Sequence, residues 1–156
     1  MDGPVGRLRL LERGGALVGL YFEEHRNAPA IPATSGASEP LDEARRQLDA
    51  YFQGRRQRFE LPLAPVGTEL QQEVWRALAA IPFGQTRSYA AIARAIGRPR
   101  AVRAVGAANA SNPISIVVPC HRVIASDGAL TGYAGGLDAK RWLLAHERGR
   151  ELTAHA

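Results

Sequence analysis

Cysteine is scarce in this sequence, since Cys120 is the only one among 156 residues. A single cysteine cannot form an internal disulfide bond, and it cannot build the thiolate cage of a structural zinc site. Metal-ligand spacing is also missing from the four histidines, which are His25, His121, His146 and His155. We therefore expect no metal and no cofactor. A free thiol stays reduced in a reducing compartment, so we expect the protein in the cytoplasm.

Long apolar runs are missing as well. No stretch reaches the roughly 18 consecutive apolar residues that a membrane-spanning helix needs. The first ten residues include Asp2, Arg7 and Arg9, and they contain neither the apolar core nor the cleavage site of a signal peptide. The sequence therefore predicts a soluble, intracellular protein.

Negative charge is absent from much of the second half. Residues 74–126 contain no aspartate or glutamate, but they contain seven arginines. The guanidinium fork fits phosphate oxygens well, and the formal net charge of the chain is +5. This distribution indicates a surface for a polyanion such as nucleic acid. The alternative is a solvated basic face without a partner.

The first half predicts a small α/β unit followed by a linker. Hydrophobic patterns and turn residues predict strands at 5–11, 16–22 and 58–61 and a helix at 40–52. Gly14-Gly15 between the first two strands is a hairpin signal. The prolines and glycine of residues 61–67 indicate the linker.

The second half predicts mainly helices, at 68–81, 88–96, 99–110 and 138–147. Thr68 with Gln71 forms a capping box, Ser88 and Asp138 are expected N-caps, and Pro99 suits the start of a helix. The helices at 88–96 and 99–110, joined by a short turn, have helix-turn-helix spacing. The β-branched run at 114–118 is expected to be extended and to end at Pro119.

The helix at 99–110 has an almost bare face of alanine and glycine, and Arg103 is the one long side chain at its centre. Two interpretations remain open at this point. The small side chains allow tight packing on a neighbouring helix, or they allow a slim helix to enter a DNA groove with one long probe.

Cys120 is followed by His121, a candidate base for activating the thiol. Adjacent residues of a regular strand point to opposite faces, so His121 serves Cys120 only if the chain turns there or a water relays the proton. A carboxylate would orient the imidazole, and Glu147, Asp127 and Asp138 are all candidates. A lone cysteine as a small buried hydrophobe and a cysteine hydrolase are the competing interpretations.

The sequence around Cys120 resembles a known family. Residues 116–124, Ile-Val-Val-Pro-Cys-His-Arg-Val-Ile, resemble the signature of the O6-alkylguanine-DNA alkyltransferases. Other family landmarks follow in the expected order, namely residues 81–84, 88–89, 101–106, 112–113, 132–136 and 142–147. The resemblance is strong over residues 68–149, and the N-terminal third resembles the family only in its strand–strand–helix outline.

The resemblance implies an α+β fold in two domains. Residues 1–67 would form a small RNase H-like α/β domain with an antiparallel sheet and a helix, followed by the linker. Residues 68–156 would form a mostly helical, winged-helix-like domain with the helix-turn-helix. The implied activity is direct repair of O6-alkylguanine, with O4-alkylthymine as a further substrate, by irreversible and stoichiometric transfer of the alkyl group to Cys120.

The resemblance also implies residue roles. Cys120 is the nucleophile, His121 takes its proton through a water, and Glu147 orients His121. Tyr89 assists base flipping and proton transfer, and Asn112 braces the turn before the cysteine. DNA contacts would come from Arg103, Tyr89, Ala104, Gly106 and Arg122, with Arg103 replacing the flipped nucleotide. The flipped base would lie against Val123, Tyr133 and Ala134.

The implied partner is double-stranded DNA, bound in the minor groove largely without regard to sequence, by a monomer that binds cooperatively. Some family members carry a zinc site in the N-terminal domain, and this chain lacks the cysteines for one. Ala134 stands where some members have serine, which leaves only a backbone N–H there. A non-catalytic damage sensor or helix-turn-helix regulator is the alternative function, although a pure sensor has no use for Cys120.

Overall fold

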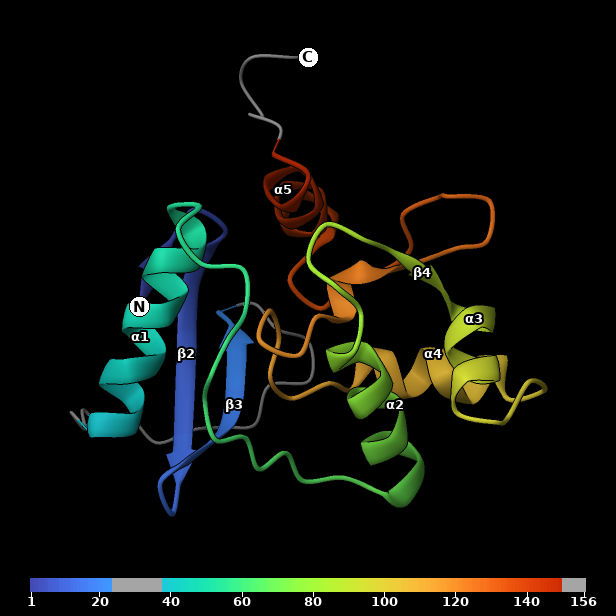
Figure 1. Ribbon diagram of the computed structural model, residues 1–156, viewed down its shortest axis with the longest axis horizontal. Coiled ribbons are helices and arrows are strands. Elements are labelled where there is room, and N and C mark those ends of the chain that lie inside the picture. The colour runs from blue at the N-terminus through green and yellow to red at the C-terminus, as the bar shows by residue number, and fades with distance from the viewer. Residues whose placement is uncertain (24–37, 150–156) are drawn as a thin grey trace.

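The computed structural model describes residues 1–23 and 38–149 and shows two regions side by side. In Figure 1 the N-terminal region, with a small sheet and helix α1, lies on the left, and a group of helices lies on the right. Helix α5 (Leu137–Glu147) lies at the top, between the two regions. Within the described residues, no helix has the length and apolar character needed to cross a membrane.

The N-terminal sheet has three antiparallel strands in the order β1 (Asp2–Gly3), β2 (Gly6–Arg13) and β3 (Ala16–Phe22). The predicted hairpin is confirmed, and both Gly14 and Gly15 have positive φ angles, which glycine adopts without strain. The predicted strand at 58–61 is wrong. The amide and the carbonyl of Glu60 bond to the side chain of Gln47 instead of a neighbouring strand, and beyond this stretch an isolated bridge forms between Leu17 and Leu63.

Helix α1 (Glu39–Phe52) covers this sheet, as its apolar pattern predicts. Ser38 caps the helix by accepting a hydrogen bond from the amide of Leu41. Its inward face buries Leu41, Ala44, Leu48 and Tyr51. Tyr51 is fully buried and continues into a core shared with the helical region.

The helical region consists of α2 (Glu69–Ala79), α3 (Tyr89–Ala95), α4 (Val102–Ala110) and α5. The capping box of Thr68 and Gln71 and the cap at Ser88 are confirmed. Helix α2 packs on α4, where the indole N–H of Trp75 donates to the carbonyl of Ala108 at 2.8 Å. Helices α3 and α4 form the helix-turn-helix, with a turn that spans residues 96–101.

Two predicted helix starts are wrong. Pro99 lies in the turn, and α4 begins at Val102 after the N-cap Ala101, with no side-chain cap. Asp138 lies inside the first turn of α5, because Gly136 with φ 91° already turns the chain into the helix. The Asp138 carboxylate pairs with Arg141 at 3.0 Å instead of capping the helix.

The segment 114–118 is not extended, in contrast to its β-branched pattern. Ile116 has φ 72°, and the amides of Val117 and Val118 bond back to the carbonyls of Ser115 and Ile114. The coil leads into a 3-10 turn, η1 (Cys120–Arg122). Strand β5 (Val123–Ile124) follows and pairs in parallel with β4 (Arg87–Ser88).

Candidate active site

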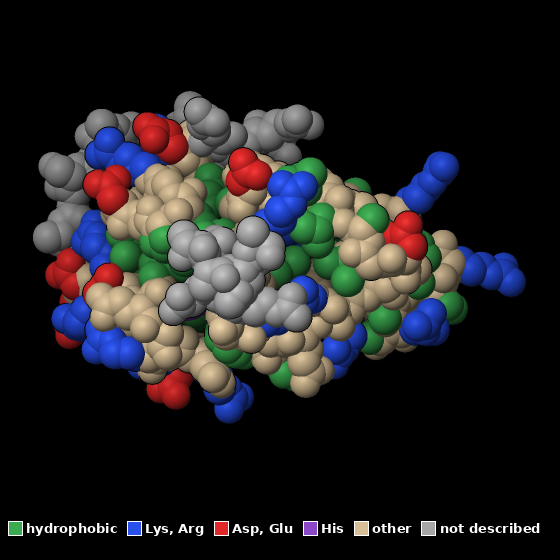
Figure 2. Space-filling model, turned by 90° about the horizontal axis from the view of Figure 1, so that it is seen from above, with side chains coloured by type: hydrophobic (Ala, Val, Ile, Leu, Met, Phe, Trp, Pro, Cys, Tyr) green, Lys and Arg blue, Asp and Glu red, His purple; other side chains and the backbone are tan. Residues whose placement is uncertain are grey.

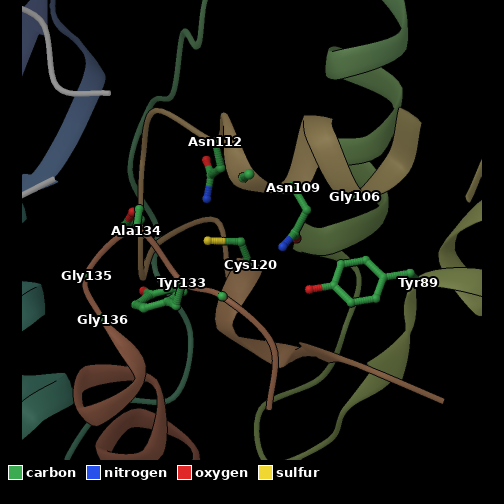
Figure 3. A pocket seen from close by; sticks show the side chains of 12 residues that line it. Tyr89, Gly106, Asn109, Asn112, Cys120, Tyr133, Ala134, Gly135 and Gly136 are labelled. Atoms are coloured by element: carbon green, nitrogen blue, oxygen red, sulfur yellow. The ribbon is translucent and has the colours of Figure 1, made fainter. Parts of the chain in front are cut away.

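Cys120 lies at the bottom of a cavity of about 580 Å³. Its side chain is only 4% exposed, because the 3-10 turn η1 folds it under the loop that precedes α5. In Figure 3 the sulfur points toward the loop with Tyr133 and Ala134, and Tyr89 and Asn109 lie on the other side of the cavity. The thiol therefore faces a space that a small molecule or an extruded base could occupy.

The surroundings of the thiol have opposing effects on its ionisation. Burial raises the pKa of Cys120, whereas the Asn112 amide, the positive charge of Lys140 and the Ser115 hydroxyl lower it. Lys140 is itself fully buried, and its ammonium donates to the carbonyls of Val123 at 2.8 Å and Thr131 at 3.3 Å. Since burial dominates, Cys120 is mainly a thiol at neutral pH and needs a base.

His121, the next residue along the chain, is the candidate for that base. The chain turns at η1, as the sequence requires if neighbouring residues are to act together. The imidazole is fully buried, and its Nε2 lies 2.7 Å from a carboxylate oxygen of Glu147. An ionised carboxylate only accepts hydrogen bonds, so Nε2 carries the proton and Nδ1 keeps its lone pair. Burial lowers the pKa of His121, partly opposed by Glu147, which keeps the ring neutral.

Glu147 ends α5 and receives hydrogen bonds from three side chains. The Arg122 guanidinium donates from Nε to Oε1 at 2.7 Å and from a terminal nitrogen to Oε2 at 2.9 Å. The Tyr51 hydroxyl donates to Oε2 at 2.6 Å from helix α1. Burial would raise the pKa of Glu147, but the bonds from His121 and Arg122 outweigh it and hold that pKa well below its usual range. The carboxylate is therefore a fixed negative charge.

Asn112 shapes the segment before the cysteine. Its amide nitrogen donates to the carbonyl of Val118 at 2.8 Å, and its amide oxygen accepts from the amide of Ile114 at 3.0 Å. One side chain thus replaces the ladder partners that an extended strand would need. This bridge explains why 114–118 coils and why the residues before Cys120 line the cavity.

The rim of the cavity comes from α3 and the loop before α5. The Tyr89 hydroxyl and the Thr131 hydroxyl share a hydrogen bond of 2.5 Å. The ring of Tyr133 packs edge-on against Phe22 of strand β3, with centroids 5.6 Å apart. Phe22 also lies against Gly135, where a β-carbon would approach its ring to 2.7 Å. Tyr89, Tyr133 and Ala134 therefore all lie around Cys120, as the resemblance implies.

The expected DNA-contacting residues divide into two groups. Arg103 is exposed on α4, and Ala104 and Gly106 are half-buried on the same helix. Figure 2 shows Lys and Arg side chains projecting from the end of the molecule that holds α3 and α4, with little acidic surface beside them. Gly106 lies at the cavity next to Tyr89, whose ring carbon is 4.0 Å from where a β-carbon would stand.

Arg122 forms the second group. The structure corrects the expectation that this side chain contacts DNA. The side chain is only 8% exposed, and three of its nitrogens donate inward, to Glu147 and to the carbonyl of Ile81. A buried arginine paired with a carboxylate has no free fork for a phosphate. Arg122 instead holds Glu147 in place.

Several residues at the site were missed from the sequence, namely Tyr51, Asn109, Ser115 and Lys140. Tyr51 was identified only as part of an amphipathic stripe, and no local signal indicates that its hydroxyl reaches Glu147. Lys140 is the only lysine of the chain and lies two residues before the family landmark at 142–147. These two features could have identified it.

Four buried side-chain atoms have no hydrogen-bond partner within the described residues, and all four belong to residues at this site. They are Asn109 Oδ1, Ser115 Oγ, His121 Nδ1 and Tyr133 Oη. Buried polar groups are normally paired, so this concentration marks a place built for a ligand. The same part of the chain contains no group of three or more His, Cys, Asp or Glu side chains arranged to hold a metal ion.

Comparisons with known proteins agree along the chain. The model of the 6-O-methylguanine DNA methyltransferase DNA binding domain matches residues 69–149, and that of the ribonuclease-like domain matches residues 1–65. The methylated-DNA–protein-cysteine methyltransferase of Methanosarcina barkeri (strain Fusaro / DSM 804) is 50% identical over 145 residues, covering 92% of each chain. The protein of that name from Mycobacterium leprae (strain TN) is 47% identical over 154 residues, covering 99% of this chain and 93% of the relative.

Solved structures give the same result. The crystal structure of Mycobacterium tuberculosis OGT in complex with DNA matches with a TM-score of 0.87 and 46% identity. The match covers 98% of this chain and 93% of that chain. A crystal structure of the Mycobacterium tuberculosis O6-methylguanine methyltransferase matches with a TM-score of 0.88 over the same shares of the two chains.

Proposed function

This chain belongs to the 6-O-methylguanine DNA methyltransferase family, and on that premise we propose that it repairs O6-alkylguanine in DNA by a single transfer of the alkyl group to Cys120. The observation that carries the proposal is the buried thiol of Cys120 at an open cavity, next along the chain to His121, which is paired with Glu147. The transfer forms a bond between Sγ and the alkyl carbon and breaks the bond between that carbon and O6. The thioether is stable, so each molecule reacts once.

The proton path follows from the hydrogen bonds. The thiol proton passes to Nδ1 of His121 through a water, and the carboxylate of Glu147 stabilises the imidazolium that forms, as in other nucleophile–base–acid arrangements. Departing guanine needs a proton as its bond to carbon breaks. We assign that donation to the Tyr89 hydroxyl, which lies on the rim of the cavity.

Base flipping brings the target to the thiol, because a stacked guanine cannot reach a buried sulfur. We propose that α4 enters the minor groove and that Arg103 occupies the place of the flipped nucleotide. Small residues such as Ala104 and Gly106 allow the close approach. Since this face offers few base-reading side chains, binding is largely independent of sequence and sensitive to salt.

We assign the remaining residues by their position. Asn112 keeps the coil before Cys120 in shape. The backbone of Cys120, Val123 and Ala134 holds the flipped base, and Tyr133 lies beside the alkyl group. Ala134 offers only its backbone N–H to O6.

The proposal also covers the domain boundary, the oligomeric state, a further substrate and the cellular location. We place the domain boundary between residues 67 and 68, within the irregular stretch that precedes α2. We propose a monomer that binds DNA cooperatively, and O4-alkylthymine as a further substrate. A thiol that must stay reduced until it reacts suits the cytoplasm, which is where we place the protein.

The test is transfer of a labelled methyl group from O6-methylguanine in duplex DNA to the protein. We expect one label per molecule, bound as S-methylcysteine at position 120, and no transfer to Cys120→Ser. Ser126→Ala, which changes an exposed serine, is the matched control and should react like the wild type. Label that persists in Cys120→Ser would remove Cys120 from the mechanism, and tight binding without any transfer would favour a sensor.

A further inference from the structure

Two buried hydroxyl groups in the cavity take no part in the bond changes or the proton transfers proposed above. Ser115 is 0% exposed, and neither its Oγ nor the Oη of Tyr133 has a hydrogen-bond partner among the described residues. Both residues line the cavity together with Cys120. An unpaired buried hydroxyl costs about 1–3 kcal/mol, so two of them in one cavity indicate a partner that arrives with the ligand.

The two hydroxyls flank the reacting sulfur. Burial raises the pKa of both Cys120 and Tyr133; Ser115 lies close enough to Cys120 to oppose the rise at the thiol, and Cys120 lies close enough to Tyr133 to add to the rise at the phenol. The three side chains therefore form one group in the wall of the cavity. The sulfur points toward the loop that contains Tyr133 (Figure 3). An alkyl group whose first carbon meets Sγ therefore has its remaining atoms in the cavity that these two hydroxyls line.

We propose that Ser115 and Tyr133 form a polar alkyl subsite that favours O6-alkyl groups bearing an oxygen, such as 2-hydroxyethyl and carboxymethyl, over hydrocarbon groups of equal size. This inference rests on the proposed alkyl transfer and names the substrates that suit it. The bonds made and broken are those of the methyl reaction, and the polar tail takes no part in them. The ammonium of the buried Lys140, beside Val123, adds a positive potential that suits the carboxylate of a carboxymethyl group.

The test compares two substrates that differ in one group. Duplexes carrying O6-(2-hydroxyethyl)guanine and O6-propylguanine have alkyl groups with the same number of non-hydrogen atoms. We expect the wild type to react about tenfold faster with the hydroxyethyl group, the effect of about one net hydrogen bond or slightly more. Ser115→Ala should reduce this ratio to about twofold, and Tyr133→Phe should reduce it by a similar factor.

The control variant is Ser126→Ala, which removes an exposed serine hydroxyl outside the cavity and should leave the ratio unchanged. Ser115→Ala removes an unpaired buried hydroxyl, so the variant should unfold at the same temperature as the wild type or higher. Tyr133→Phe keeps the ring against Phe22 and provides the second variant.

Three outcomes would overturn the subsite. One is a wild-type ratio near one. Another is a ratio that both variants leave unchanged. The third is an equal loss on both substrates in Ser115→Ala, which would show that the hydroxyl serves only the thiolate. Transfer from O6-methylguanine, measured in parallel, tests the alkyl transfer itself, so failure of the proposed function is distinguished from failure of the subsite.

Discussion

The N-terminal and C-terminal regions differ in how they take part in the site. Among the residues that the structure describes, those lining the cavity around Cys120 all come from the C-terminal region, between Tyr89 and Gly136. The described part of the N-terminal region contributes no lining residue, yet it contacts three parts of the site. The difference teaches that one region carries the chemistry and the other fixes its geometry.

The three contacts involve the coil before Cys120, the loop over the cavity and the carboxylate of Glu147. The free edge of β3 binds the coil before the cysteine, where the amide of Leu20 donates to Pro113 at 2.8 Å and the amide of Ser115 donates to Leu20 at 3.2 Å. Phe22 packs against Tyr133 and Gly135 in the loop over the cavity. Tyr51 holds the carboxylate of Glu147. The N-terminal region therefore supports the coil before Cys120, the loop over the cavity and the carboxylate that pairs with His121.

The largest change in the rate of alkyl transfer is expected from a substitution in the C-terminal region. Arg103→Ala removes the side chain that we propose takes the place of the flipped nucleotide, and flipping costs a few kcal/mol. We expect transfer from duplex DNA to slow by about 100-fold, equivalent to about 2.7 kcal/mol. Reaction with free O6-benzylguanine needs no flipping and should change less than about twofold. Both rates are measured under single-turnover conditions.

Arg141→Ala provides the matched control for Arg103→Ala. Arg141 is an exposed arginine on α5 that pairs with Asp138, so its loss changes the net charge equally. It should leave both rates close to the wild type. Equal losses on duplex and free base in Arg103→Ala would show that the arginine supports the fold rather than the flipped state.

A smaller change in the rate of alkyl transfer is expected from a substitution in the N-terminal region. Tyr51→Phe keeps the ring but removes one hydrogen bond to Glu147. The carboxylate then attracts the proton on His121 more strongly, which raises the pKa of the imidazole. We expect transfer to free O6-benzylguanine to slow by about tenfold near pH 6, because a hydrogen bond to a charged group contributes about 1.5–3 kcal/mol. The acid limb of the pH–rate profile should move to higher pH.

Phe59→Leu separates this effect from a general loosening of the two regions. Phe59 packs against the ring of Tyr51, with centroids 5.3 Å apart, and makes no hydrogen bond to Glu147. It should lower the unfolding temperature without moving the acid limb. An unmoved limb in Tyr51→Phe would reduce the role of the tyrosine to packing.

The sequence predicts the C-terminal region better than the N-terminal support, and the reason is the distance along the chain. Cys120 and His121 are adjacent, so their motif is local and recognisable. Tyr51 and Glu147 are 96 residues apart, and only the folded core brings them together. Spacing alone left Glu147 and the aspartates as equal candidates for the partner of His121, and resemblance selected Glu147.

Two further differences show side chains overriding local pattern. The run at 114–118 has strand propensity, but hydrogen bonds from Asn112 coil it. Propensity gives no weight to such a bridge. Arg122 follows Cys120 in a stretch without acidic residues, and the family resemblance implies that it contacts DNA. Its bidentate pairing with Glu147 instead compensates the cost of burying it.

The smallest effect is expected from the burial of His121, which pairs with the same carboxylate that Tyr51 of the N-terminal region contacts. Burial lowers the pKa of this imidazole in the folded protein, whereas the unfolded chain binds a proton near pH 6.5. The stabilising contribution of the neutral ring is complete above pH 6.5, and it is lost as the pH falls toward the folded pKa. This one group should lower the free energy of unfolding by at most about 1.4 kcal/mol per pH unit below 6.5. Urea unfolding of wild type and His121→Gln between pH 7 and pH 5 measures the difference, which should shrink on acidification because the glutamine has no such proton. A constant difference would mean that the folded site takes up the proton as readily as the unfolded chain, and that burial does not hold the imidazole neutral.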